Sequence, residues 1–126
     1  MKNKHFGKRM EKRTLDFSVS VIKLSTSLSF NPEQKAIRNQ ITRSATSIGA
    51  NYREANRSRS AADFRNKIKI CESETNETIY WLELIKKLNL SNGESLSEIL
   101  MEANELLAIF TTIANKLERK NDQGNT

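Results

Sequence analysis

Chain-breaking residues are rare in this sequence, and their rarity constrains the fold more than any other feature. The 126 residues include one proline and four glycines, whereas folds built from short strands need such residues at many turns. Apolar residues instead recur at helical spacing through most of the chain. We therefore expect long helices, no convincing strand and a single domain.

Four helices are predicted from this spacing, over about residues 9–29, 31–56, 61–88 and 95–119. Each of the last three begins at a capping signal, in which a side-chain oxygen accepts a hydrogen bond from a free backbone N–H. The signals are Asn31 followed by Pro32, Ser60 with Asp63, and Ser95 with Glu98. Helices of this length with short connections pack most simply as an antiparallel up-down-up-down four-helix bundle, which is an all-α fold.

The predicted bundle occupies residues 9–119, and the two ends of the chain differ from it in composition. Residues 1–8 are rich in lysine, and residues 120–126 are rich in Asn, Asp, Gln and Gly. We expect a flexible basic arm before the bundle and a flexible tail after it.

The sequence holds few of the side chains on which enzymes and metal sites depend. It has one cysteine and one histidine, and Cys71 falls on the predicted inner face of the third helix, as an inert buried thiol would. No predicted helix carries the Glu-x-x-His motif of metal sites in bundles, and no nucleophile has a base beside it. We expect no catalytic residue, no metal and no cofactor, and therefore no enzyme.

Membrane signals are also missing from the sequence. No apolar run is about 18 residues long, and the start MKNKHFGKRMEKR lacks the apolar stretch of a signal peptide. We expect a cytoplasmic protein without membrane contact.

The net charge of +6 is distributed unevenly along the chain. Residues 1–60 hold 13 Lys or Arg against 4 Asp or Glu, a balance of +9, whereas residues 61–126 hold 8 against 11, a balance of −3. A basic half can attract phosphates, or it can serve subunit contacts and solubility. Charge blocks alone do not choose between these interpretations.

A stripe of cations follows the outer face of the second helix, and each of them could neutralise a phosphate. The predicted nucleic-acid contacts are Lys35, Arg38, Arg53, Arg57 and, just beyond the helix, Arg59. The cations of the N-terminal arm would add to them: Lys2, Lys4, Lys8 and Arg9. The alternative is a charged face that is simply solvated.

Two helices carry a second apolar stripe that a bundle core does not need. On the first helix the stripe is Leu15, Val19 and Ile22, and on the third it is Ile70, Trp81, Leu84 and Leu88. A four-helix bundle has no deep centre to hide such faces, so they indicate either a broad core face or contact with another subunit. We favour a homo-oligomer, with Trp81 as an aromatic anchor. The predicted interface residues are Arg43, Asn51, Glu54, Glu77 and Trp81.

Two segments carry a family resemblance: RTLDFSVSVIKL at 13–24 and RSATSIGANYREANRSRSAADFRNKIKICESETNETIYWLELI at 43–85. The most specific part is S-x-G-A-N-Y-R-E-A with a downstream D-F and E-T-x-Y-W-L. In these segments the chain resembles the bacterial four-helix-bundle proteins encoded by intervening sequences inside 23S rRNA genes. The matching residues are Arg43, Ser47, Gly49, Asn51, Glu54, Asp63, Phe64, Glu77 and Trp81.

The resemblance implies a left-handed up-down-up-down bundle that assembles as a homopentamer. The chain is also similar to the accessory protein of diversity-generating retroelements, a basic pentamer that engages a reverse transcriptase and nucleic acid. We therefore expect a non-enzymatic, oligomeric bundle that binds the backbone of RNA or DNA. The alternative is a protein–protein interaction scaffold, with an acidic protein as partner and no nucleic-acid ligand.

Overall fold

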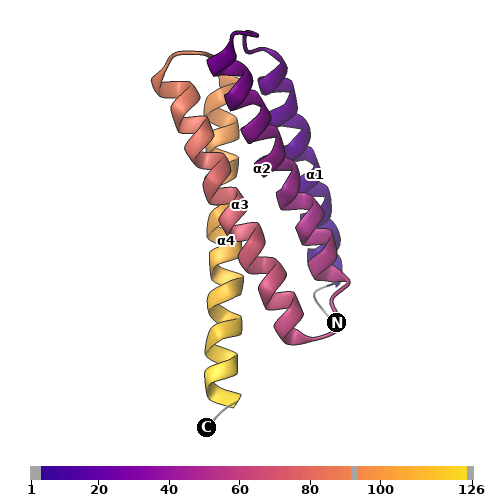
Figure 1. Cartoon of the computed structure of the whole chain (residues 1–126). Coiled ribbons are helices and arrows are strands. Elements are labelled where there is room, and N and C mark those ends of the chain that lie inside the picture. The colour runs from indigo at the N-terminus through magenta and orange to yellow at the C-terminus, as the bar shows by residue number, and fades with distance from the viewer. Residues whose placement is uncertain (1–3, 92–93, 125–126) are drawn as a thin grey trace.

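The computed structural model describes residues 4–91 and 94–124, and nearly all of them are helical (Figure 1). The four helices are α1 (Lys4–Thr26), α2 (Pro32–Asn56), α3 (Ala61–Lys87) and α4 (Glu94–Gly124). These residues contain no strand. The predicted all-α fold of four helices is confirmed.

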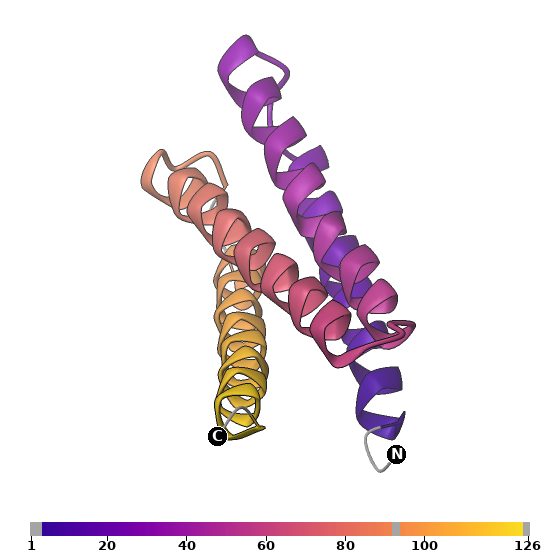
Figure 2. The same ribbon diagram turned by 60° about the horizontal axis from the view of Figure 1, so that its bottom comes forward.

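The helices follow one another up, down, up and down (Figure 1). Each packs against the next along the chain, and a smaller contact between α1 and α4 closes the bundle. The start of α1, the connection between α2 and α3, and the end of α4 therefore share one end of the molecule, which is the lower end in Figure 1. At that end α4 leans away from α1, as Figure 2 also shows.

The core forms where the inner stripes of the four helices meet. The apolar side chains that recur at helical spacing are buried along most of the four helices, and those with no exposed surface include Val21, Ile41, Ile48, Ile68, Leu82, Ile85, Leu106 and Phe110. Burying one such side chain contributes about 1.5–3 kcal/mol. Phe64, Ile113 and Leu117 are half-buried, and they lie toward the end at which α4 leans away.

Small residues let α1 and α2 approach closely. A Cβ atom on Gly49 would lie 3.2 Å from the Thr14 hydroxyl oxygen. The Ser18 hydroxyl donates to the carbonyl oxygen of Ala45 at 3.3 Å. The run of small side chains around Gly49 thus serves contact between these two helices.

The start of α1 differs from the prediction. The helix begins at Lys4 and ends at Thr26, so residues 4–8 extend it instead of forming an arm. The physical reason is packing: Phe6 lies against the core, and Gly7 is buried where a Cβ atom would be 3.1 Å from Asn56 Nδ2. Residues 1–3, including Lys2, lie outside the described residues.

The bounds of α4 also differ from the prediction. The helix begins at Glu94, so Ser95 lies inside its first turn and is not the cap that the sequence pattern predicts. At the other end α4 continues to Gly124, through most of the predicted tail. Among the described helices, none combines the length and hydropathy needed to span a bilayer.

Candidate functional site

Arg43 of α2 and Glu77 and Trp81 of α3, three of the predicted interface residues, meet within the single chain. The Arg43 guanidinium donates to Glu77 Oε2 at 2.5 Å, and Trp81 Nε1 donates to the same oxygen at 3.0 Å. Arg43 also pairs with Glu74 at 3.3 Å. These three residues and Glu74 form one polar network across the surface between α2 and α3.

The network shifts the pKa values of its charged members. The hydrogen bond from Trp81 and then that from Arg43 hold the pKa of Glu77 below its usual value. The Glu77 and Glu74 carboxylates raise the pKa of Arg43. Both shifts favour the ionised pair, because each partner donates to or accepts from the charged form of the other.

The network continues along α2. Ser47 Oγ donates to Glu74 Oε2 at 3.2 Å, and Asn51 Nδ2 donates to the Ser47 carbonyl and hydroxyl oxygens at 2.9 and 3.0 Å. Four of the five predicted interface residues therefore share one hydrogen-bonded set, whereas Glu54 is exposed one turn further on. Glu74 was not among the predicted interface residues, although its spacing of three residues from Glu77 places both on one helix face.

An aromatic edge borders the network. Trp81 is half-buried and packs against the core, and Tyr80, which is exposed, meets its ring edge-on at a centroid distance of 4.9 Å. The indole N–H of Trp81 is satisfied within the chain by Glu77. The role of Trp81 as an anchor for a second subunit stays a prediction.

The second apolar stripe of α1 lies at the surface. Leu15, Val19 and Ile22 are 50%, 44% and 39% exposed. In the single chain this stripe is therefore not part of a broad core face. On α3 the second stripe is mixed, because Trp81 and Leu84 pack against the core while Ile70 and Leu88 remain exposed.

The five predicted nucleic-acid contacts fall into two groups. Lys35 and Arg38 lie in the first turns of α2, whereas Arg53, Arg57 and Arg59 lie at its end and in the connection to α3. Lys35 and Arg53 are 18 residues apart, or about 27 Å at 1.5 Å per residue. The structure thus divides the predicted stripe into two patches.

The two patches differ in their surroundings. Arg38 is half-buried, donates to the Leu28 carbonyl oxygen at 3.3 Å and lies 4.1 Å from the centre of the Phe30 ring. Arg53, Arg57 and Arg59 are exposed, and none of them pairs with a carboxylate among the described residues. The second patch is therefore the more available to an external anion.

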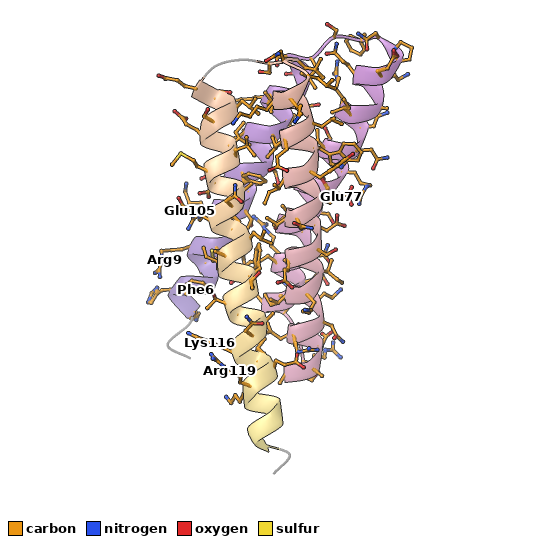
Figure 3. The ribbon with its side chains drawn as sticks, turned by 90° about the vertical axis from the view of Figure 1, so that its left-hand side faces the viewer. Phe6, Arg9, Glu77, Glu105, Lys116 and Arg119 are labelled. Atoms are coloured by element: carbon orange, nitrogen blue, oxygen red, sulfur yellow. The ribbon has the colours of Figure 1, made fainter. Side chains whose placement is uncertain are left out.

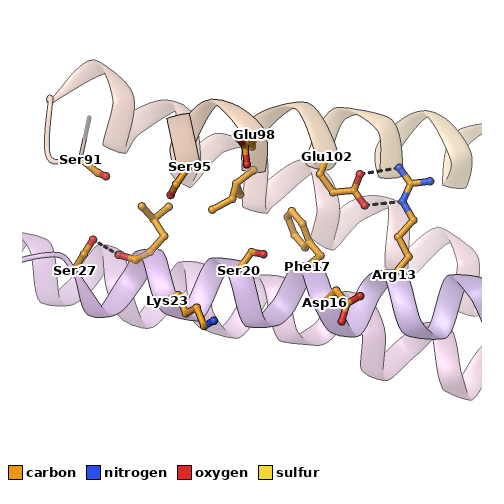
Figure 4. Close-up of a pocket in the computed structure, with 12 residues that line it drawn as sticks. Arg13, Asp16, Phe17, Ser20, Lys23, Ser27, Ser91, Ser95, Glu98 and Glu102 are labelled. Atoms are coloured by element: carbon orange, nitrogen blue, oxygen red, sulfur yellow. Dashed lines mark hydrogen bonds and ion pairs between the residues drawn. The ribbon is translucent and has the colours of Figure 1, made fainter. Parts of the chain in front are cut away.

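A groove of about 580 Å³ runs between α1 and α4, the pair of contacting helices with the smallest contact in the bundle (Figure 4). Its apolar lining is Phe17, Leu24 and Ile99, and its polar lining is Arg13, Asp16, Ser20, Lys23, Ser27, Ser91, Ser95, Glu98 and Glu102. Arg13 bridges the two helices with paired hydrogen bonds of 2.6 and 2.7 Å to Glu102. This bridge could not be predicted from spacing along a helix, because it joins residues 89 positions apart.

Neither the groove nor the network assembles a recognisable catalytic set. Cys71 is buried and free, and burial raises the pKa of its thiol to about 12. The predicted burial of this thiol is confirmed. In residues 4–91 and 94–124, no group of three His, Cys, Asp or Glu side chains is placed to hold a metal ion.

The fold and these surfaces define a small all-α bundle with a polar network, an exposed apolar stripe and exposed cations. The chain belongs to the 23S rRNA-intervening sequence protein family, whose model matches residues 9–112. It is also similar to a crystal structure from Bacteroides thetaiotaomicron, described as a protein with unknown function from the S23 ribosomal protein family. That chain is 36% identical, with a TM-score of 0.76, and the match covers 82% of this chain and 96% of the other.

These comparisons confirm the family that the sequence resembles. No curated protein matches the chain. Neither the family description nor that of the Bacteroides protein names an enzymatic activity.

Proposed function

We propose that this protein is a non-enzymatic, oligomeric bundle that associates with RNA or DNA through contacts to the phosphate backbone. The observation that carries the proposal is a group of exposed cations, Arg53, Arg57 and Arg59, that pair with no carboxylate in the part of the chain that the structure describes. Such cations can neutralise phosphates and release condensed counterions. The family's link to 23S rRNA genes supports RNA as the first polymer to test.

The proposal includes a homo-oligomer, which is five-membered by family resemblance. Its support is the stripe formed by Leu15, Val19 and Ile22, because three exposed apolar side chains on one helix face lose contact with water when a second copy covers them. Repeating the cations in an oligomer would also strengthen binding to a long polymer, since each further contact becomes intramolecular.

A salt titration tests the nucleic-acid proposal. The protein is titrated into a fluorescent hairpin taken from 23S rRNA and into a DNA duplex of equal length, and anisotropy is recorded between about 50 and 200 mM salt. We expect affinity to fall by a factor of about 10 or more across this range, as several phosphate contacts require. Absence of binding at the lowest salt concentration contradicts the proposal.

The alternative function is a scaffold that binds an acidic protein, and the exposed apolar stripe of α1 is the observation that favours it. The absorbance of freshly purified protein distinguishes the scaffold from the nucleic-acid-binding bundle. Co-purified nucleic acid raises the ratio of absorbance at 260 nm to that at 280 nm. A protein-like ratio, combined with no binding in the titration, favours the scaffold.

A further inference from the structure

Cations from three distant segments gather at one end of the bundle. We name as the basic end residues 4–10 of α1, residues 53–67 around the α2–α3 connection, and residues 116–120 of α4. These residues hold 11 Lys or Arg against 3 Asp or Glu, a balance of +8, whereas the other 10 cations and 12 carboxylates of the chain leave −2. The positive charge of the protein is therefore concentrated at this end.

Contacts between the helices place the three segments at the same level. Asn56 Nδ2 of α2 donates to the Gly7 carbonyl oxygen of α1 at 3.4 Å. Arg65 of α3 pairs with Glu118 of α4. In Figure 3 the labelled side chains of Arg9, Lys116 and Arg119 lie on the same side of the molecule, with Arg9 near mid-height and Lys116 and Arg119 below it.

The cations of the basic end are poorly matched by carboxylates. Among the described residues, its one ion pair joins Arg65 to Glu118. Near the middle of the bundle the situation is the reverse, because Arg13 and Arg43 each contact two carboxylates. A local excess of positive charge without internal partners favours an external polyanion.

Helix stability does not explain the cations of α1. A helix N-terminus carries partial positive charge, so lysine and arginine are unfavourable there. Yet α1 begins at Lys4, has no acidic residue in its first turn, and carries Lys8 and Arg9 in the next one. Arg53 in the last turn of α2 suits the helix dipole, but the cations of α1 oppose it.

The basic end offers charge without rings on which bases could stack. The large apolar side chains that are exposed in the described residues all lie outside it, and its Phe6 and Phe64 are half-buried against the core. Binding of single strands relies on exposed aromatic side chains, whereas a duplex presents closely spaced phosphates on a stiff surface. The chemistry of this end therefore suits a duplex backbone.

We infer that the basic end is the nucleic-acid contact surface, and that it binds the backbone of a double-stranded segment of RNA or DNA without reading its bases. This inference rests on the proposed function and makes it specific. It assigns a contact role to Lys8, Arg9, Arg57 and Arg59 and removes one from Lys35, which lies at the opposite end of the bundle.

Two charge-reversal variants and a matched control test the inference. Lys8→Glu/Arg9→Glu changes α1, and Arg57→Glu/Arg59→Glu changes the α2–α3 connection. Lys35→Glu/Lys86→Glu makes the same change in net charge at two exposed residues of the opposite end. Because Glu is favourable near a helix N-terminus, the first variant is expected to fold, and circular dichroism with thermal melting checks all three.

Each protein is titrated into RNA and DNA duplexes of about 20 base pairs of unrelated sequence, and into the separate single strands. We expect either basic-end variant to lose about 10-fold or more in duplex affinity and to reduce the salt slope by about two. The control should stay within about threefold of the parent. Comparison of the two duplexes shows which backbone is preferred.

The outcomes separate this inference from the proposed function. If the parent binds and all three variants lose affinity equally, binding follows net charge alone and the basic end is not the site. If the parent binds single strands more tightly than duplexes, the duplex assignment is wrong. If the parent binds no nucleic acid at low salt, the proposed function fails and this inference fails with it.

Discussion

A single carboxylate oxygen of Glu77 connects α2 with α3. One carboxylate oxygen accepts from both Arg43 and Trp81, and these hydrogen bonds hold the pKa of Glu77 below its usual value. A lowered pKa in the folded state stabilises the fold above the unfolded-state pKa of about 4.3. That contribution is lost as the pH falls through the folded-state value.

Replacing Glu77 by glutamine should therefore lower the free energy of unfolding by an amount that depends on pH. We expect Glu77→Gln to lower the free energy of unfolding by about 0.5–1 kcal/mol at pH 7, a small value because the side chain is partly exposed. The difference from the parent should shrink below about pH 4.3. Urea unfolding at pH 7 and at acid pH measures it, with Glu83→Gln, an exposed carboxylate on the same helix, as the control. An equal loss at both pH values would contradict the assignment.

Cys71 gives a second prediction at the scale of one residue. Its thiol is buried, burial raises its pKa to about 12, and Cys71 Sγ donates to the Ile48 carbonyl oxygen at a distance of 3.5 Å. At pH 8 the thiol is therefore protonated and shielded, so we expect a thiol reagent to label the native protein only at the rate at which it opens. Labelling in urea should be fast and complete. If Cys71 in the native protein reacts as fast as a solvent-exposed cysteine, the thiol is accessible and this prediction is wrong.

Contacts between side chains on different helices could not be predicted from the sequence. Spacing along a helix placed Asn51 on the same flank of α2 as Arg43, and Glu77 on the same face of α3 as Trp81, because angles around a helix follow from residue number. It could not pair Arg43 with Glu74, or Arg13 with Glu102, since those pairs depend on the register between helices. The basic end was missed for the same reason.

At the scale of the helix, capping was predicted correctly where the side chain itself marks the boundary. Asn31 accepts from the Gln34 N–H at 2.9 Å, and Ser60 accepts from the Asp63 N–H at 3.0 Å. Ser95 fits the same pattern but lies inside α4. Boundaries set by packing were harder to predict: α1 extends back to Lys4 because Phe6 reaches the core.

Capping variants test these boundaries. We expect Asn31→Ala and Ser60→Ala each to lower the free energy of unfolding by about 1 kcal/mol, because each leaves a backbone N–H without its acceptor. Ser95→Ala should cost less than about 0.5 kcal/mol, as a substitution within a helix at an exposed site does. Urea unfolding of the three variants measures the difference. If Ser95→Ala lowers the free energy of unfolding as much as Ser60→Ala does, then Ser95 is the N-cap of α4 after all.

At the scale of the whole molecule, the stripe on α1 connects assembly with binding. Leu15, Val19 and Ile22 remain exposed in the single chain, and a second copy is the occupant that we propose for them. A lysine at Val19 would put a charge into that contact, at a position exposed enough to keep the fold intact. Met101, which is 64% exposed on α4, provides a matched control.

Val19→Lys is therefore expected to convert the proposed oligomer into a monomer of 14.4 kDa, whereas Met101→Lys should leave the proposed oligomer intact. Light scattering after size-exclusion chromatography measures both masses. If Val19→Lys keeps the mass of the parent assembly, this stripe is not the contact.

Val19→Lys and Met101→Lys also distinguish two effects on nucleic-acid binding: that of the added charge, and that of the number of basic ends in one assembly. Each variant adds one positive charge, so charge alone predicts slightly tighter binding to a duplex for both. Valency predicts the opposite for Val19→Lys, because a monomer presents one basic end where an oligomer presents several to the same polymer. We expect Val19→Lys to bind a long duplex at least about 10-fold more weakly than Met101→Lys. On a duplex too short to reach a second basic end, the two variants should bind alike, since no second contact is then available to lose.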